Sequence, residues 1–291
     1  MSDFINLVLA GLATGAIYAL VAIGFALLWQ TSQTINFAQG EFVMLPAFFM
    51  LIGLNRGLPY WAAILIGIAA SMLVLGLAFK RLLVDPMLRH GVLPLAIATM
   101  ALSVFLKETV KTFYGAEAYT FPSLVPDQTV FLAGFPVSLQ RLAVLAAAIA
   151  AVIALQLLLN RTSLGRQMQA AAQNPQTARI LGIPVERMIL LTFLINAVLV
   201  SVGSLLIAPD YQAKFSMGDT LGSSAFIAAI VGGFNQVRGA IAGGLLLGVV
   251  SNLAAAYGLS TYRDAIPLLL LIAVIIWRPQ GLFGRTEERT V

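Results

Sequence analysis

The chain is divided into long stretches without any charged side chain, separated by short segments in which the charges gather. A charge in the hydrocarbon core of a membrane costs several kcal/mol, so each charge-free stretch is a candidate transmembrane helix. The pattern predicts an all-α, polytopic transmembrane bundle of about eight or nine spans. The stretches are 4–40, 42–55, 57–79, 91–106, 142–160, 188–209, 220–237, 239–262 and 265–277.

Three of these expected helices are too short for a full crossing, which takes about 20 residues. They are 42–54, the apolar part of 220–234, and 265–277, and the last would form only about 20 Å of helix. Short or broken helices occur in membrane proteins where they are buried in protein or line a cavity. The first stretch is instead too long, and we expect its helix to end near Trp29, before the polar residues 30–36.

The distribution of basic residues predicts the orientation. With nine crossings and the N-terminus outside, most of the 17 Lys and Arg residues fall on the cytoplasmic side, as the positive-inside rule requires. The opposite orientation reverses this bias. We therefore expect the N-terminus outside and the C-terminus in the cytoplasm, in the inner (cytoplasmic) membrane of a bacterium.

The composition excludes a soluble enzyme, because 60% of the 291 residues are hydrophobic and only 10% are charged, against about 25% charged in soluble domains. The net charge of +5 does not indicate nucleic-acid binding, since the basic residues are scattered singly or in pairs. The sequence contains no cysteine, one histidine, and no P-loop, zinc-protease or serine-hydrolase motif. We expect no catalytic residue, metal or cofactor, and solute movement that is passive or driven by another polypeptide.

Two loops are long. Residues 107–141 form an extracytoplasmic loop in this interpretation, and the β-branched and aromatic residues of 129–138 predict a short hairpin within it. A surface cap without a specific role is the simpler interpretation of that loop. The second loop, 160–187, is cytoplasmic and predicts two short helices. Ser163 is the expected N-cap of the first helix, Asn174 that of the second, and Gly182 the glycine that ends it.

The first of these cytoplasmic helices is amphipathic. Its small apolar face includes Ala171 and lets a partner approach closely, while Arg166 lies on the opposite, polar face. The alternative is a segment lying on lipid, but lipid-binding helices usually carry Trp or Phe anchors, which this loop lacks.

Isolated polar residues within the apolar stretches are candidates for a translocation pathway. Asn196 is an amide well inside an expected span, and Asn36, Gln39 and Glu41 cluster at a helix break. Together with Ser223, these residues form our predicted pathway set. For most hydroxyl residues the alternative is a hydrogen bond between or within helices. The wider set of polar residues includes Thr99, Ser103, Ser201, Ser204, Ser224, Ser251 and Asn252.

Several motifs resemble one family, the LivH-type permeases of branched-chain amino acid ABC importers. The similar stretches cover nearly the whole chain, and one departure is Gln39, where many members carry His. They are GLATGAIYAL at 11–20, INFAQGEF at 35–42, GR…AAAQN…ARILGI within 165–183, and GGF…GAIAGG within 232–244.

The resemblance implies a single transmembrane permease domain over residues 1–291 that translocates branched-chain (hydrophobic) amino acids. It further implies a second LivM-like permease, two cytoplasmic ATPase subunits that bind the ATP, and a periplasmic substrate-binding protein. Loop 160–187 would be the coupling loop, with Arg166, Ala171, Asn174, Arg179 and Gly182 at the ATPase contact.

Three alternatives remain. A related ABC permease would carry urea, amides or other amino acids. A stand-alone channel or facilitator would need no ATP. A membrane-embedded enzyme would need acid, base or nucleophile groups, of which the sequence offers no recognisable set.

Overall fold

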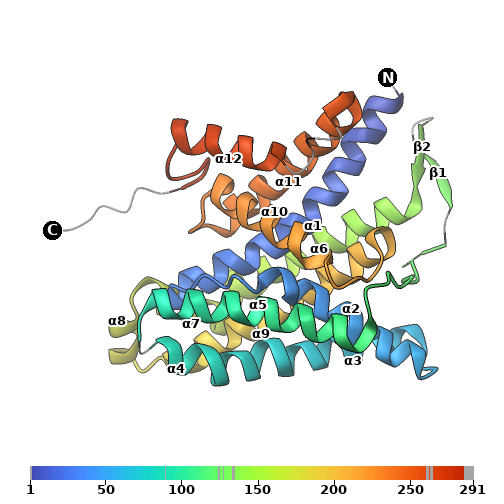
Figure 1. Ribbon diagram of the computed structural model, residues 1–291. Coiled ribbons are helices and arrows are strands. Elements are labelled where there is room, and N and C mark those ends of the chain that lie inside the picture. Colours follow the sequence, from blue (N-terminus) through green and yellow to red (C-terminus); the bar gives the residue numbers. More distant parts are fainter. Residues whose placement is uncertain are drawn as a thin grey trace.

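The computed structural model describes residues 2–88, 90–123, 125–126, 128–132, 135–259, 262 and 265–284. Over these ranges the chain is a helical bundle with one small hairpin (Figure 1). The elements are α1 (Ser2–Ser32), α2 (Gln39–Asn55), α3 (Tyr60–Ser71), the π-helical turns η1 (Met72–Ala78) and η2 (Lys80–Val84), α4 (Asp85–Leu88), α5 (Val92–Tyr114), β1 (Thr129–Leu132), β2 (Phe135–Ser138), α6 (Leu139–Arg161), α7 (Ser163–Gln173), α8 (Pro175–Ile180), α9 (Val185–Tyr211), α10 (Met217–Gly232), α11 (Val237–Ala254), η3 (Ala255–Leu259) and α12 (Ala265–Trp277).

The helices confirm the predicted helical class. Within the described ranges, six helices are long and apolar enough to cross a membrane, and α3 runs through η1 and η2 into α4 as one of them. The three expected short helices are also present, as α2, α10 and α12. The predicted hairpin is confirmed as well: β1 pairs antiparallel with β2, with Thr129 opposite Ser138.

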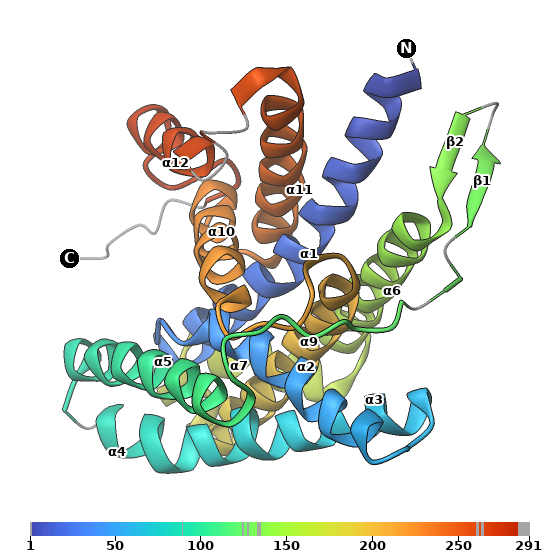
Figure 2. The same cartoon turned by 45° about the vertical axis from the view of Figure 1, so that its right-hand side comes forward.

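The bundle has two distinguishable ends, which we call the hairpin end and the α8 end (Figures 1 and 2). The start of α1 lies near β2 at the hairpin end. The other end of α1 reaches the turn between α10 and α11, where Gln30 Nε2 donates to the Asn235 carbonyl oxygen at 2.8 Å. The segment after α12 lies beside the same turn, since the Leu282 amide donates to the Val231 carbonyl oxygen at 2.9 Å.

Helix α1 is the centre of the molecule and packs against α6, α9, α10 and α11. Small residues allow its close approach to α11, because a Cβ on Gly15 would lie only 2.8 Å from the Gly244 carbonyl oxygen. Such small-residue contacts are the usual way in which helices pack in lipid. Residues 16–28 of α1 are correspondingly almost all buried.

Two half-helices, α2 and α10, begin inside the bundle. Gln39, the first residue of α2, contacts Asn196 in the middle of α9. The beginnings of the two half-helices also meet each other: a Cβ on Gly218 would lie 2.6 Å from the Gly40 carbonyl oxygen, and one on Gly222 would lie 2.7 Å from the Gly40 Cα. We call these three residues the glycine junction.

The order of elements around the glycine junction repeats with opposite direction. Helix α1 runs toward the α8 end and is followed by the half-helix α2, which runs back toward α3 (Figure 1). Helix α9 starts beside α8 and runs away from it, and the following half-helix α10 runs back, because the turn after α10 meets the far end of α1 at Gln30. Inverted repeats with broken helices at the centre are a common plan for membrane transport proteins.

Candidate functional site

The loop between α6 and α9 forms α7 and α8, and its local signals lie close to where the sequence predicts them. The Asn174 side chain accepts the Thr177 amide at 2.9 Å and caps α8, as predicted. Gly182 has φ +79 and follows α8 in the expected position, with its amide donating to the Arg179 carbonyl oxygen at 3.0 Å. The predicted cap of α7 is one residue off, because Thr162, not Ser163, accepts the Gly165 amide.

The apolar face of α7 is covered by the chain itself, so our expectation that a partner approaches this face is wrong. Met168 and Ala171 are 2% and 1% exposed, because α7 packs against α1, α6 and α9. Ala171 is therefore buried beneath the surface and cannot contact a partner directly. The other predicted coupling residues, Arg166, Asn174, Arg179 and Gly182, are exposed at the α8 end.

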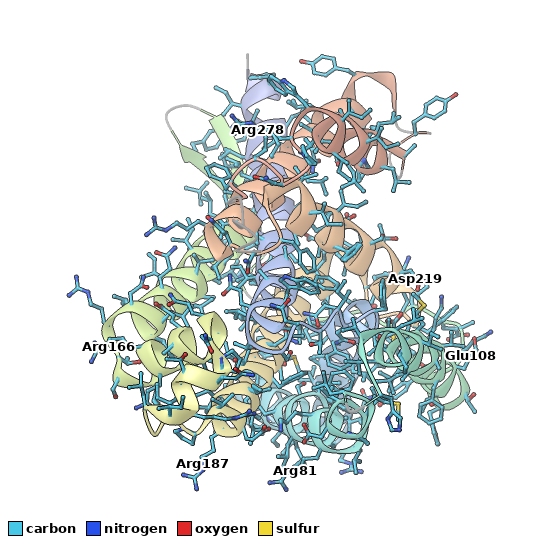
Figure 3. The ribbon with its side chains drawn as sticks, turned by 90° about the vertical axis from the view of Figure 1, so that its left-hand side faces the viewer. Arg81, Glu108, Arg166, Arg187, Asp219 and Arg278 are labelled. Atoms are coloured by element: carbon cyan, nitrogen blue, oxygen red, sulfur yellow. The ribbon has the colours of Figure 1, made fainter. Side chains whose placement is uncertain are left out.

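An apolar tip at the end of α8 was not anticipated. Ile180 and Leu181 are 85% and 72% exposed, although both are large hydrophobic residues. They directly precede Gly182, so two consecutive apolar residues at a helix end, outside any membrane span, were the available signal. Basic residues surround this end of the molecule, where Arg81, Arg166 and Arg187 project outward (Figure 3).

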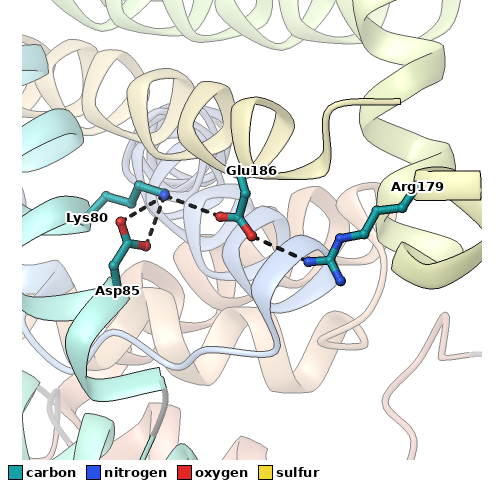
Figure 4. Close-up of polar contacts among 4 residues, drawn as sticks. All are labelled: Lys80, Asp85, Arg179 and Glu186. Atoms are coloured by element: carbon teal, nitrogen blue, oxygen red, sulfur yellow. Dashed lines mark hydrogen bonds and ion pairs between the residues drawn. The ribbon is translucent and has the colours of Figure 1, made fainter. Parts of the chain in front are cut away.

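A chain of ion pairs connects α8 to three other elements (Figure 4). Arg179 Nη2 lies 3.4 Å from Glu186 Oε1 at the start of α9. The second oxygen of Glu186 lies 3.7 Å from Lys80 Nζ of η2, and Lys80 also contacts Asp85 of α4 at 2.9 Å. The Lys80 side chain is only 8% exposed, whereas those of Glu186 and Arg179 are 70% and 58% exposed. The network thus runs from the surface of α8 into the membrane helix formed by α3 to α4.

Three of the predicted pathway residues meet at the start of α2. Gln39 Nε2 donates to Asn196 Oδ1 at 2.7 Å, and Asn196 Nδ2 donates to Gln39 Oε1 at 3.1 Å. Asn36 Nδ2 donates to the same Gln39 oxygen at 3.3 Å. All three side chains are buried, at 2% exposure or less. Because their amides bind one another, the geometry favours a structural role in holding α2 against α9.

The other two predicted pathway residues lie near a second polar cluster. Glu41 is 4% exposed and lies beside Ser103 of α5. Next to it, Lys107 of α5 forms an ion pair with Asp219 in the first turn of α10, and these side chains are 28% and 49% exposed. Ser223 follows Asp219 by one turn on the exposed face of α10. Lys107 and Asp219 were not among the predicted site residues, because their pairing joins positions 112 residues apart.

The sequence matches one protein family over almost its full length. The matching family is described as "Branched-chain amino acid transport system / permease component", and the match covers residues 7–275. The chain belongs to this family. This permease is 32% identical to the high-affinity branched-chain amino acid transport permease BraD of Pseudomonas aeruginosa, over 97% of this chain and 96% of that protein. It is 30% identical to LivH of Escherichia coli K12, over 99% and 98%.

A third relative has a similar name. The probable LivH of Methanocaldococcus jannaschii is 28% identical over 91% of this permease and 88% of the relative. These matches confirm the resemblance seen in the sequence and establish an ABC importer permease, a multi-pass membrane protein whose relatives are transport subunits and not enzymes. Permeases of this class work with ATPase and binding-protein partners.

Proposed function

We propose that this permease translocates branched-chain (hydrophobic) amino acids across the bacterial inner membrane, driven by ATP hydrolysis in partner subunits. The observation that carries the proposal is the end-to-end similarity to relatives that are named for this transport. The exposed α8 tip and the ion-pair network behind it support it, because they provide a route by which a partner can move the membrane helices.

The deciding experiment is reconstitution. The permease is assembled in liposomes with its second permease subunit, the two ATPases and the binding protein, and uptake of labelled leucine is measured with and without ATP. We expect uptake only with ATP and the binding protein. Uptake of urea or amides instead of leucine, or uptake by the isolated chain without ATP, would contradict the proposal.

The proposed topology has the N-terminus outside and the C-terminus in the cytoplasm, with 1–291 as one permease domain. The basic residues at the α8 end and the hairpin at the opposite end support it. Because the chain lacks cysteine, single cysteines report the orientation. In intact cells a membrane-impermeant thiol reagent should label Glu117→Cys in loop 107–141, and should label Gln176→Cys in loop 160–187 only after permeabilisation. The reverse pattern would refute this orientation.

Loop 160–187 is the proposed coupling loop, and its contact with the ATPase is formed by Arg166, Asn174, Arg179 and Gly182 with the apolar tip Ile180–Leu181. Gly182 offers a controlled test. An alanine there would meet no atom within 4 Å but would have to adopt φ +79, which costs about 1–2 kcal/mol. Gly57, between α2 and α3, has φ +77 and the same empty surroundings.

Gly57→Ala is therefore the matched control for Gly182→Ala. We expect both variants to lose similar stability, and only Gly182→Ala to reduce uptake per ATP hydrolysed. Equal coupling in both variants would show that the position of Gly182 has no special role.

The proposed pathway runs along the exposed face of α10 past Ser223 and beside the buried Glu41 of α2, with the second, LivM-like permease completing it. Helices α5 and α12 flank this face and expose large apolar side chains, including Leu93 at 72% and Leu269 at 63%. Copurification followed by identification of the subunits tests whether the LivM-like permease is present. Finding only two copies of this chain would contradict the proposal of a second, different permease.

A further inference from the structure

A cavity of about 540 Å³ lies beside the beginning of α10. It is formed by α10, α11 and α12 together with Tyr18 of α1 and Tyr211 at the end of α9. This volume is within the roughly 300–1,000 Å³ range of small-molecule sites. The cavity therefore has room for a small solute in the part of the protein that surrounds the proposed pathway.

The cavity has a charged rim. Asp219 and Thr220, both exposed, line it from the first turn of α10. The Asp219 carboxylate is also the partner of Lys107, so a positive and a negative charge stand together at this place. Charged side chains within a membrane span cost free energy unless water or a partner surrounds them. In transport proteins such charges therefore tend to line the pathway, where water or the solute reaches them.

One residue of the cavity wall carries a buried hydroxyl that has no hydrogen-bond partner among the described residues. Ser251 of α11 is 7% exposed and lines the cavity, and its Oγ has no partner among the described residues. Serines in helices normally donate to the carbonyl oxygen four residues before, as Ser201 does to Ala197 at 2.7 Å. An unsatisfied buried hydroxyl costs free energy, so a polar group of a ligand that reached Ser251 Oγ from the cavity would be stabilised there.

Part of the cavity lining is apolar. Ile227 of α10 and Pro267 and Leu268 of α12 form this part. A carboxylate, several hydroxyl groups and apolar side chains together match a free amino acid with an aliphatic side chain. Its ammonium group fits Asp219, its carboxylate fits the hydroxyl groups of the lining, Ser251 among them, and its side chain fits the apolar residues around Ile227.

We propose that this cavity is a binding site for zwitterionic aliphatic amino acids during their passage, with Asp219 and Ser251 as the residues that hold the polar end. The choice of an amino acid rests on the proposed function, whereas the cavity and its unsatisfied hydroxyl are features of the fold.

Protection of a single cysteine tests the site directly, because the natural chain has none. Thr220→Cys, at the rim, is the reporter, and Gln173→Cys, on the exposed face of α7, is the control outside the cavity. Both are prepared in membranes that contain the complete importer. The rate of modification by a small methanethiosulfonate is measured with and without L-leucine.

Leucine at about four times its Kd should slow modification of Thr220→Cys about fivefold, since only the empty site reacts, and should leave Gln173→Cys unchanged. Leucinamide lacks the carboxylate and 4-methylpentanoate lacks the ammonium group, so both should protect poorly. Asp219→Asn or Ser251→Ala in the reporter chain should weaken protection about tenfold or abolish it. Ser204→Ala, which removes a different unpartnered buried hydroxyl, should not.

The outcomes separate this site from the proposed function. Leucine uptake by the natural importer together with an unprotected reporter would overturn the site and leave the function standing. An importer that does not take up leucine contradicts the function, and the protection result still decides the site. A reporter that the reagent does not reach even without leucine would also overturn it, because the cavity must be open to a solute.

Discussion

The reciprocal amide pair between Gln39 and Asn196 makes a quantitative prediction about what fixes the start of α2. The two hydrogen bonds measure 2.7 and 3.1 Å, and both side chains are fully buried. Removing one partner leaves a buried donor or acceptor unsatisfied, at about 1–3 kcal/mol. We therefore expect Gln39→Ala and Asn196→Ala each to lower the free energy of unfolding by about that amount.

The double variant separates the interaction energy of the two amides from the cost of removing each side chain. Hydrogen bonds between membrane helices contribute about 0.6 kcal/mol on average and up to about 1.7, so two bonds predict a coupling energy of about 1–2 kcal/mol. The measurement is the free energy of unfolding of the full chain in bicelles for the natural protein, both single variants and the double variant. Additive effects, with coupling below about 0.5 kcal/mol, would refute the reasoning.

Gly24 provides a second, independent check of the same contact, and Gly203 serves as its control. A Cβ on Gly24 would overlap both Asn196 Oδ1 and Gln39 Nε2, so Gly24→Ala should push the amide pair apart and destabilise the fold. On α9, a Cβ on Gly203 would meet Val21 Cγ2 at an ordinary 3.5 Å. Gly203→Ala should leave stability unchanged or raise it by up to about 1 kcal/mol, since alanine favours helix.

Three further predictions concern the α8 end. Lys80→Met should lower the free energy of unfolding by less than about 1 kcal/mol, because Asp85 and Glu186 stay accessible to water. The same variant should lower ATP-driven uptake, and unchanged uptake would exclude a role for the network in coupling. Ile180→Asp should keep the stability of the chain within about 0.5 kcal/mol, because the side chain is 85% exposed, and should abolish copurification of the ATPase; retained ATPase would exclude this contact. Asn174→Ala should cost about 1 kcal/mol and speed hydrogen exchange in the first turn of α8, and unaltered exchange would contradict the capping role.

What the sequence predicted well depends on neighbours along the chain. The short helices follow from the spacing of charges, and the capping by Asn174 and the turn at Gly182 involve partners three or four residues away. The misplaced cap of α7 is an error of the same local kind, since Thr162 and Ser163 are adjacent residues of similar capping ability.

What the sequence could not predict depends on partners far apart. The pattern of α7 shows that Ala171 lies on an apolar face, but it does not show whether a partner or the chain's own helices cover that face. Gln39 and Asn196 are 157 residues apart, and each looked like a lone polar group in an apolar stretch. Only the fold shows that their amide groups form hydrogen bonds with each other. It also shows that the exposed charge of this region belongs to a different residue, Asp219.

The glycine junction sets a limit on how this molecule can be altered. Where Gly40 meets Gly218 and Gly222, the two half-helices touch main chain to main chain, with no space for even a methyl group. A larger residue at any of these three positions would therefore force α2 and α10 apart, so neither selection nor design can adjust the contact between them through residue size. Changes of cargo must be sought in the surrounding walls, while the crossing itself stays a fixed point of the architecture.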